Sequence, residues 1–298
     1  MYYNENTIIY SKGELVKAAE AKTDLFSQSL HYGYGVFEGI RSYKTVNGST
    51  KIFKAEEHFQ RLENSARLLN MPYSWSADEL IEATYQVLEN NNLQDAYIRP
   101  LVYAPANMSF NQNTTSYIVI EAWHMQPFLG DKLLKVMISS FQRPNPKAFK
   151  IEAKATGHYV NSILASQEAK ANGFDEALLL DANNFIAEAP GANVFIEKDN
   201  VIFTPQPGNI LPGITRATVI EICNYLNIEV IEKEITVEEF RAADSAFFCG
   251  TAAEVIGIRS VDEVQLPNNW EESSGAKIQQ FYKDLVTEKN YIAELKTA

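Results

Sequence analysis

The sequence contains only two cysteines in 298 residues, Cys223 and Cys249, and they do not form a C-x-x-C pair. Each is flanked by apolar residues, so we expect two buried free thiols and a reducing compartment. Long apolar runs are missing as well, since no stretch approaches the about 18 residues of a membrane-spanning helix. The N-terminus, M-Y-Y-N-E-N, lacks the basic and apolar regions of a signal peptide. We therefore expect a cytoplasmic protein without a membrane partner.

Positive charge is also scarce. The chain has 26 Lys and Arg residues against 38 Asp and Glu residues, which gives a formal net charge of −12. Such a chain repels nucleic acids and anionic membranes, so neither is expected as a partner. The length suits one large or two medium domains, and the composition, 46% hydrophobic and 21% charged, is typical of a soluble globular protein.

Several common catalytic motifs are absent. The segment H-Y-G-Y-G-V-F-E-G has glycines at 33, 35 and 39, but a dinucleotide-binding fingerprint needs its third glycine at position 38, which is Glu38. There is no phosphate-binding loop of the G-x-x-x-x-G-K-[ST] type and no G-x-S-x-G nucleophile elbow. The histidines form no H-x-x-x-H pair and have no cysteine nearby, so no metal site is expected; they are His31, His58, His124 and His158.

The first half of the chain reads as a mixture of helices and strands. Residues 56–70 predict a helix with Phe59, Leu62, Ala66 and Leu69 on one face. A second helix is predicted from Ser76, because Glu79 completes a capping box. Runs rich in Ile, Val, Tyr and Phe predict strands; they cover 96–103, 117–123 and 133–141.

The second half continues the same mixture. A helix is predicted at 159–172 with Gly173 as its C-cap, another from Thr215, and an amphipathic helix from Glu271. Strands are predicted at 176–181, 185–188, 192–197, 201–204, 228–234 and 245–249.

Pro127 and Gly130 interrupt regular structure between the two halves. We expect a smaller N-terminal α/β domain at 1–124, a linker at 125–132 and a larger C-terminal domain at 133–298.

Two segments are suited to binding an anion. L-P-G-I-T-R, residues 211–216, directly precedes a predicted helix, whose N-terminal amides attract phosphate. C-G-T-A-A-E, residues 249–254, follows a strand end, and Gly250 lets an anion approach the backbone. Each segment alone is more typical of an ordinary turn and helix cap, and only the presence of both in one chain makes an anion site an equally good interpretation.

Lys154 stands among small residues in E-A-K-A-T-G-H-Y, which leaves room for a planar ring over its amine. A lysine in an apolar pocket can act as a nucleophile on an aldehyde, although a solvated lysine ahead of a helix fits the spacing too. Glu188 ends an apolar strand, where a carboxylate is either half-exposed or buried with a positive partner. A phosphate site, a lysine and a carboxylate for a protonated pyridine nitrogen together indicate pyridoxal 5'-phosphate (PLP).

Seven separated motifs, in order, resemble the class IV aminotransferases of PLP fold type IV, and among them the branched-chain-amino-acid aminotransferases. They are H-Y-G-Y-G-V-F-E-G-I-R (31–41), R-L-E-N-S-A (61–66), A-Y-I-R-P (96–100), A-K-A-T-G-H-Y (153–159), E-A-P-G-A-N-V-F (188–195), L-P-G-I-T-R (211–216) and G-T-A-A-E (250–254). The resemblance implies a two-domain α/β (α+β) fold like that of D-amino-acid aminotransferase, with mixed sheets and helices and with PLP bound by the C-terminal domain. It implies transfer of the amino group of leucine, isoleucine or valine to 2-oxoglutarate. A D-amino-acid aminotransferase and an aminodeoxychorismate lyase remain the alternatives on this fold.

The resemblance also implies residue roles. Lys154 is implied to be the catalytic lysine that holds PLP covalently, Glu188 the acid on the pyridine nitrogen, and Arg61 the arginine on the phosphate. The other implied cofactor contacts are Tyr159, Leu211, Gly213, Ile214, Thr215, Gly250 and Thr251.

The implied substrate site combines aromatic, basic and backbone groups. Its members are Tyr32, Phe37, Gly39, Arg41, Tyr97, Arg99, Gly191, Thr251 and Ala252. Arg99 is implied to receive the distal carboxylate of glutamate, and Tyr32 is implied to reach in from a second subunit, so at least a homodimer is expected. Departures from the family pattern are Met125, Phe128, Pro190 and Ala192.

Overall fold

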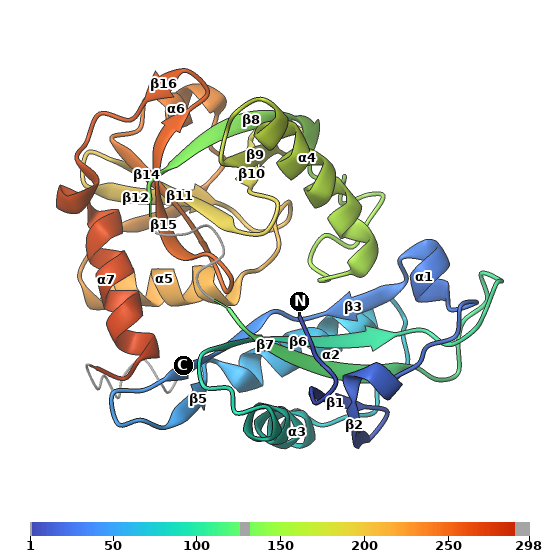
Figure 1. Ribbon diagram of the computed structural model, residues 1–298. Coiled ribbons are helices and arrows are strands. Elements are labelled where there is room, and N and C mark those ends of the chain that lie inside the picture. The colour runs from blue at the N-terminus through green and yellow to red at the C-terminus, as the bar shows by residue number, and fades with distance from the viewer. Residues whose placement is uncertain (1, 126–131, 290–298) are drawn as a thin grey trace. The chain divides into compact units, whose positions relative to one another are not determined.

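The computed structural model describes residues 2–125 and 132–289, and the chain divides into two compact units (Figure 1). Unit 1 comprises Met1–Gln126 and Ala153–His158, and unit 2 comprises Pro127–Glu152 and Tyr159–Ala298. Residues 126–131, which include most of the predicted linker with Pro127, Phe128 and Gly130, lie outside the described residues. Lys154 therefore belongs to unit 1, although the sequence around it follows the first strand of unit 2.

Unit 1 is built on a seven-stranded sheet in the order β2-β1-β7-β6-β4-β5, with β3 also paired to β6. The pairings within it are antiparallel. Helices α2 and α3 lie along one face of this sheet (Figure 1) and bury its apolar core. The elements are β1 (Ile8–Ser11), β2 (Glu14–Lys17), α1 (Gln28–Tyr32), β3 (Gly35–Phe37), β4 (Ile40–Lys44), β5 (Thr50–Ile52), α2 (Ala55–Leu68), α3 (Ala77–Asn90), β6 (Ala96–Tyr103) and β7 (Tyr117–His124).

Unit 2 is built on a nine-stranded mixed sheet in the order β10-β9-β8-β15-β14-β11-β12-β13, with β16 paired to β15. An additional pairing of β10 with β11 closes six of these strands into a ring, whose interior is filled by apolar side chains. Its strands are β8 (Leu134–Gln142), β9 (Glu176–Leu180), β10 (Ile186–Glu188), β11 (Asn193–Lys198), β12 (Val201–Pro205), β13 (Val230–Lys233), β14 (Ser245–Gly250), β15 (Glu254–Val261) and β16 (Val264–Gln265). Its helices are α4 (Tyr159–Ala171), α5 (Ile214–Tyr225), α6 (Val237–Arg241) and α7 (Ser274–Val286).

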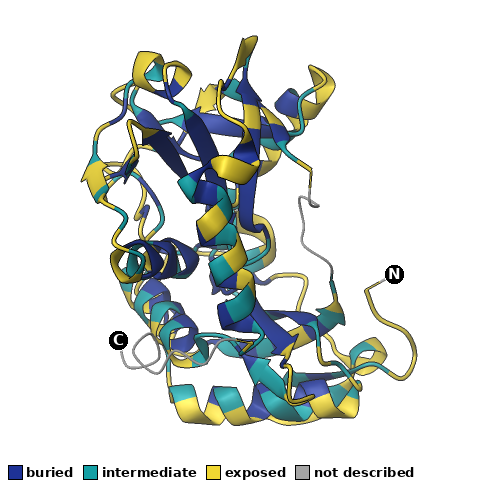
Figure 2. Ribbon diagram, turned by 90° about the vertical axis from the view of Figure 1, so that its left-hand side faces the viewer, coloured by how far each residue is buried: buried dark blue, intermediate teal, exposed yellow. Residues whose placement is uncertain are grey.

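The strongest local sequence signals are confirmed. Helix α2 buries Phe59, Leu62 and Ala66, as the periodicity predicted. Ser76 caps α3 through a capping box with Glu79. Helices show alternating buried and exposed bands in Figure 2, as expected for helices that cover a sheet.

Some elements were not predicted. In the segment 28–44, α1, β3 and β4 follow one another within a few residues, and their glycines obscure the strand pattern. Strand β15 was missed as well, because the small residues before it read as a loop.

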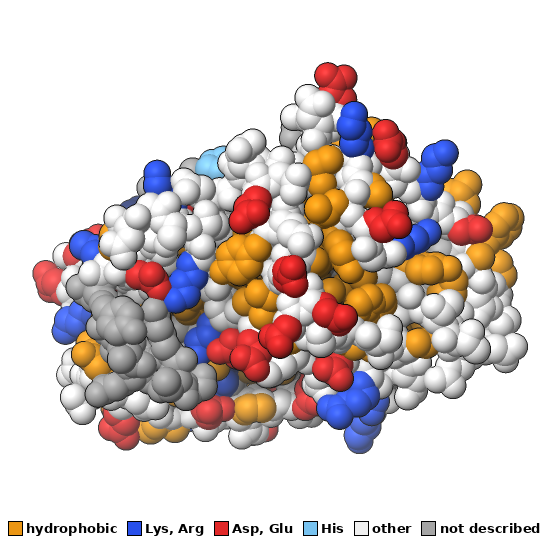
Figure 3. Space-filling view, turned by 90° about the horizontal axis from the view of Figure 1, so that it is seen from below, with side chains coloured by type: hydrophobic (Ala, Val, Ile, Leu, Met, Phe, Trp, Pro, Cys, Tyr) orange, Lys and Arg blue, Asp and Glu red, His pale blue; other side chains and the backbone are white. Residues whose placement is uncertain are grey.

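Both cysteines are buried and free, as predicted. Burial raises the pKa of Cys223 to about 12 and raises the pKa of Cys249 still further, so neither thiol ionises near neutral pH. No described helix is long and apolar enough to cross a membrane. Acidic side chains gather near the middle of the face shown in Figure 3, in keeping with the net charge of −12.

Candidate active site

The backbone of Lys154 is held from two sides within unit 1. The Phe37 amide donates to the Lys154 carbonyl at 3.0 Å. The Lys154 amide donates to Ser65 Oγ on α2 at 3.1 Å. Ala155 forms an isolated antiparallel bridge with Val36 of β3. These contacts fix the lysine between β3 and α2.

The small residues that surround Lys154 in the sequence allow this close approach. Gly157 donates its amide to the Gly33 carbonyl at 3.0 Å. Thr156 Oγ1 donates to the same carbonyl at 2.6 Å. A Cβ on Gly33, whose φ is +64°, would lie 2.7 Å from Gly157 Cα. The alanine, threonine and glycine neighbours therefore serve backbone packing.

Replacing Gly33 by alanine is expected to destabilise the protein by about 2–4 kcal/mol, because it combines a left-handed backbone with a clash against Gly157. Gly48→Ala is the matched control, since Gly48 has a φ of +80° but nothing within 4 Å of its added Cβ. Its loss should be about 1–2 kcal/mol. Urea unfolding followed by tryptophan fluorescence measures both, and equal losses would show that the Gly33–Gly157 approach contributes nothing.

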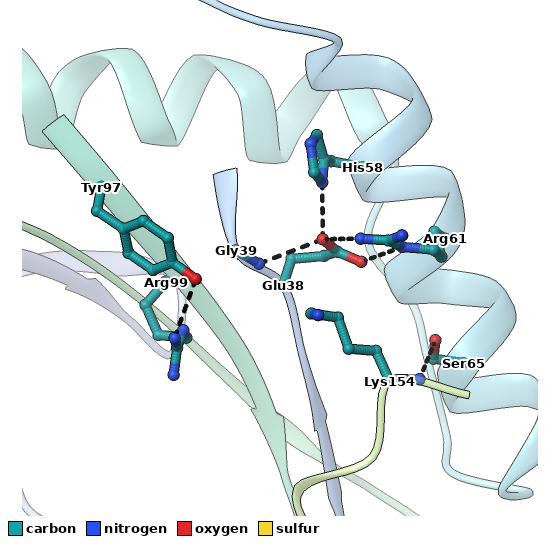
Figure 4. Close-up of polar contacts among 8 residues, drawn as sticks. All are labelled: Glu38, Gly39, His58, Arg61, Ser65, Tyr97, Arg99 and Lys154. Carbon is teal, nitrogen blue, oxygen red and sulfur yellow. Dashed lines mark hydrogen bonds and ion pairs between the residues drawn. The ribbon is translucent and has the colours of Figure 1, made fainter. Parts of the chain in front are cut away.

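The side chains of Lys154 and Arg99 both contact the aromatic ring of Phe37. Lys154 Nζ lies 5.1 Å from the centroid of the Phe37 ring, and Arg99 Cζ lies 4.5 Å from the same centroid. Figure 4 shows the lysine side chain extending toward Glu38, which pairs with Arg61. Phe37, Lys154 and Arg99, three of the predicted site residues, are thus brought together in unit 1.

Arg99 is held on β6 between two aromatic rings. Its Nη2 donates to Tyr97 Oη at 3.1 Å, and its Cζ lies 5.2 Å from the Tyr97 ring centroid. A Cβ at Gly39 would lie 2.1 Å from Tyr97 Oη, so only glycine leaves room for that hydroxyl. Glu121 stands opposite Arg99 on β7; burial raises the Glu121 pKa and Arg99 lowers it in part.

Two other predicted site residues of unit 1, Arg41 and Tyr32, contact residues outside the Phe37, Lys154 and Arg99 group. Arg41 Nη2 donates to the Met125 carbonyl at 3.1 Å, and its Cζ lies 5.0 Å from the Tyr43 ring centroid. Tyr32 is exposed, its hydroxyl donates to the Met108 carbonyl at 3.3 Å, and its ring centroid lies 5.4 Å from that of Phe110.

The sequence motifs did not single out the most strongly buried ionic cluster of this region. Glu38 is fully buried and accepts from Arg61 Nε at 2.7 Å and Arg61 Nη2 at 2.9 Å. His58 Nδ1 lies 2.7 Å from Glu38 Oε2 (Figure 4). The one sequence signal was the position of Glu38 between apolar residues in V-F-E-G, where a carboxylate needs a partner.

In unit 2, Glu188 is buried at the pairing that closes the ring of strands. It is 4% exposed and stands opposite Asn193 where β10 meets β11. Arg143 Nε lies 2.8 Å from Glu188 Oε1, and the Leu211 amide donates to the same oxygen at 3.1 Å. Asn193 Nδ2 donates to Glu188 Oε2 at 3.0 Å. The carboxylate is therefore buried, paired and fixed in orientation.

Arg143 and Asn193 were missed as partners of Glu188. Asn193 lies within the motif E-A-P-G-A-N-V-F, so its proximity in sequence was a usable signal. Arg143 lies just after β8, far from Glu188 along the chain, and only the sheet brings the two together.

The start of α5 fits the predicted anion site. Gly213 is its N-cap, and none of the described side chains caps it. A Cβ at Gly213 would lie 1.9 Å from Asn193 Oδ1, which excludes larger residues. Ile214 and Thr215 open the helix, and the amides of a first helical turn have no partner within the helix.

The turn between β14 and β15 completes this cluster. It contains Thr251 and Ala252, both half-buried. A Cβ on Gly250 would lie 3.1 Å from the Gly191 carbonyl, so the turn adjoins the loop that follows Glu188. Unit 2 thus brings together segments 188–193, 211–215 and 250–252. Tyr159, the remaining predicted cofactor contact of this unit, is the first residue of α4.

Known proteins resemble this chain over most of its length. The family model for amino-transferase class IV matches residues 35–261. The branched-chain-amino-acid aminotransferase of Pseudomonas aeruginosa is 42% identical over 95% of this chain and 94% of its own.

Solved structures give the same result. The branched-chain aminotransferase of Thermoproteus uzoniensis with norvaline superposes with a TM-score of 0.92 at 37% identity, over 95% of this chain and 96% of its own. The branched-chain amino acid aminotransferase of Thermobaculum terrenum in its PLP form gives a TM-score of 0.89 at 32% identity, over 96% of each chain. The chain therefore belongs to the amino-transferase class IV family.

Proposed function

We propose that this protein is an aminotransferase that uses PLP to move the amino group of leucine, isoleucine or valine to 2-oxoglutarate. The products are branched 2-oxo acids and L-glutamate. One observation carries the proposal: the Lys154 amine and the Arg99 guanidinium both lie over the Phe37 ring. The Glu38–Arg61 ion pair lies in the same unit. The similarity to branched-chain aminotransferases over nearly the whole chain supports the same activity.

The side chains on both units suit PLP, which the class IV aminotransferases use. Unit 1 offers the Lys154 amine and the Arg61 guanidinium. Unit 2 offers the buried carboxylate of Glu188 and the start of α5, which no described side chain caps. An amine for an aldehyde, a carboxylate for a pyridinium and a helix N-terminus for a phosphate are the complementary groups.

Each proposed role follows from local chemistry. When bound, PLP supplies a ring that accepts electrons from the substrate Cα. Lys154 holds the cofactor covalently and, once its amine is released, takes the proton from Cα and returns it. Glu188 keeps a proton on the ring nitrogen. Arg61 and the start of α5 bind the phosphate; the further proposed cofactor contacts are Tyr159, Leu211, Gly213, Gly250 and Thr251.

Arg99 suits a pocket that must accept both an apolar side chain and a carboxylate. Its guanidinium lies over the Phe37 and Tyr97 rings. An apolar substrate side chain can therefore contact the aromatic carbons, and the distal carboxylate of glutamate can pair with the guanidinium. The remaining proposed substrate contacts are Tyr32, Gly39, Arg41, Gly191, Thr251 and Ala252. The two substrates use this pocket in turn, which gives ping-pong kinetics.

We also propose that the protein works in the cytoplasm as a homodimer or a larger homo-oligomer. Exposed apolar side chains in and around α1 support association: Leu25 is 76% exposed, Phe26 64% and Leu30 58%, with Tyr32 and Phe110 beside them. Such a group of side chains on a protein surface favours contact with a partner.

A panel of amino donors tests the proposed reaction. L-leucine, L-isoleucine, L-valine and D-leucine are each incubated with the PLP-loaded enzyme and 2-oxoglutarate, and glutamate is measured. Formation of glutamate from the three L-amino acids and not from D-leucine is expected. Preference for D-leucine would instead identify a D-amino-acid aminotransferase. Pyruvate release from aminodeoxychorismate without an amino acceptor would identify a lyase.

A further inference from the structure

Glu38 is held by two side chains from one face of α2. Arg61 donates to both of its oxygens, at 2.7 Å from Nε and 2.9 Å from Nη2, and His58 Nδ1 lies 2.7 Å from Oε2 (Figure 4). The Gly39 amide also donates to Oε2, at 3.2 Å. His58 and Arg61 are three positions apart on the helix, so they project in the same direction.

The ionisation of the cluster follows from burial and charge. Burial alone would raise the pKa of Glu38, but Arg61 and His58 outweigh it and lower the pKa well below its usual range. Burial lowers the pKa of His58, and Glu38 offsets this only in part. Glu38 is therefore ionised at neutral pH, and a neutral His58 donates its Nδ1–H to the carboxylate.

A buried ion pair of this kind is weak evidence for a role in stability, because desolvation of both charges offsets their attraction. What the pair does provide is orientation. Two parallel N–H···O bonds along the Nε edge fix the plane of the Arg61 guanidinium. An arginine held in this way loses little conformational freedom when an anion binds to it.

The same helix also holds the backbone of Lys154. Ser65, four positions after Arg61 on α2, accepts the Lys154 amide at 3.1 Å. The distance between the arginine and the lysine backbone is therefore set by one turn of a regular helix. A cofactor that carries an aldehyde for the lysine and a phosphate for the arginine requires a fixed spacing of this kind.

We propose that Glu38 is the positioning residue for Arg61: it locks the guanidinium in the orientation that receives the cofactor phosphate. This rests on the proposed function, in which Arg61 binds the phosphate of PLP. In this role Glu38 touches neither cofactor nor substrate and acts through Arg61 alone, and His58 holds the carboxylate from the other side.

The test compares two aldehydes that differ only in the phosphate. Dissociation constants of PLP and of pyridoxal are measured by absorbance titration for the wild-type protein and for Glu38→Gln. Both aldehydes react with Lys154, so the ratio of their constants isolates the phosphate contact. We expect Glu38→Gln to weaken PLP binding at least about tenfold more than pyridoxal binding, even though the substitution makes the site more positive.

Two further variants keep the test decisive if Glu38→Gln folds poorly. Glu38→Asp keeps the charge but shortens the side chain, so the carboxylate cannot reach both guanidinium nitrogens as before. This variant is also expected to weaken PLP binding more than pyridoxal binding. In an Arg61→Lys background, Glu38→Gln should leave the ratio of the two constants unchanged, because the group that Glu38 positions is gone.

Glu197→Gln is the matched control. Glu197 is 4% exposed and accepts from Ser245 Oγ and the Ser274 amide, outside the proposed site. Loss of the Glu197 carboxylate should lower the stability of the protein without changing the ratio of the PLP and pyridoxal dissociation constants. Equal weakening of PLP and pyridoxal by both Glu38 variants would overturn the positioning role. A wild-type protein that binds neither aldehyde would overturn the proposed function itself.

Discussion

Lys154→Ala is expected to lower transamination by more than about 10⁴-fold, because one amine serves both as the covalent anchor of the cofactor and as the base at Cα. The variant should also lose the visible absorption of covalently held PLP. Borohydride treatment followed by mass spectrometry should find the cofactor on residue 154 of the wild-type protein and no label on the variant.

The structure predicts that this loss is chemical and not a folding defect. Lys154 is fixed through its backbone, by the Phe37 amide and Ser65 Oγ, and both contacts remain when the side chain is removed. When both proteins are compared without cofactor, the variant should therefore keep the thermal unfolding midpoint of the wild-type protein. Lys150→Ala, at an exposed position just upstream, is the control and should keep full activity. An active, yellow Lys154→Ala protein would refute the assignment.

Glu188→Gln is expected to keep PLP bound and to lower turnover by about 100- to 1,000-fold, as the loss of one fixed electrostatic contact does in other enzymes. Glutamine has nearly the same shape and still accepts from the Leu211 amide, but it cannot hold a proton on the ring nitrogen by charge. Turnover is measured with L-leucine and 2-oxoglutarate, and cofactor content by absorbance after desalting.

The substitution also removes the partner of the buried Arg143, whose Nε lies 2.8 Å from Glu188. Some loss of stability is therefore expected beside the loss of turnover. Glu176→Gln is the control, since Glu176 is 5% exposed on the neighbouring strand β9 but lies outside the proposed site. Unchanged turnover in a Glu188→Gln protein that retains its cofactor would contradict the role of Glu188.

Elements with strong local signals were predictable from the sequence. The capping box at Ser76, the helical periodicity of α2 and the apolar run that forms β6 each depend on residues a few positions apart. The segment 28–44 resisted the same reasoning. Its short elements are defined by contacts with distant segments, such as the bridge from Val36 to Ala155.

The proposed site shows the same division. Lys154, Glu188 and the start of α5 could be proposed from residue type and motif order. Glu38 and Arg143 could not, because their partners are distant in sequence: Arg61 approaches Glu38 from α2, and Arg143 approaches Glu188 from the end of β8.

The amino-acid sequence by itself determined the family and the residue types available for chemistry, since ordered motifs persist along the chain whatever their spatial arrangement. Only the tertiary structure decided which charges face one another and that Lys154 belongs to unit 1, apart from the strands that flank it in sequence. The physical reason is that burial and ion pairing depend on through-space distances of a few ångströms, and the folding of remote segments sets these distances.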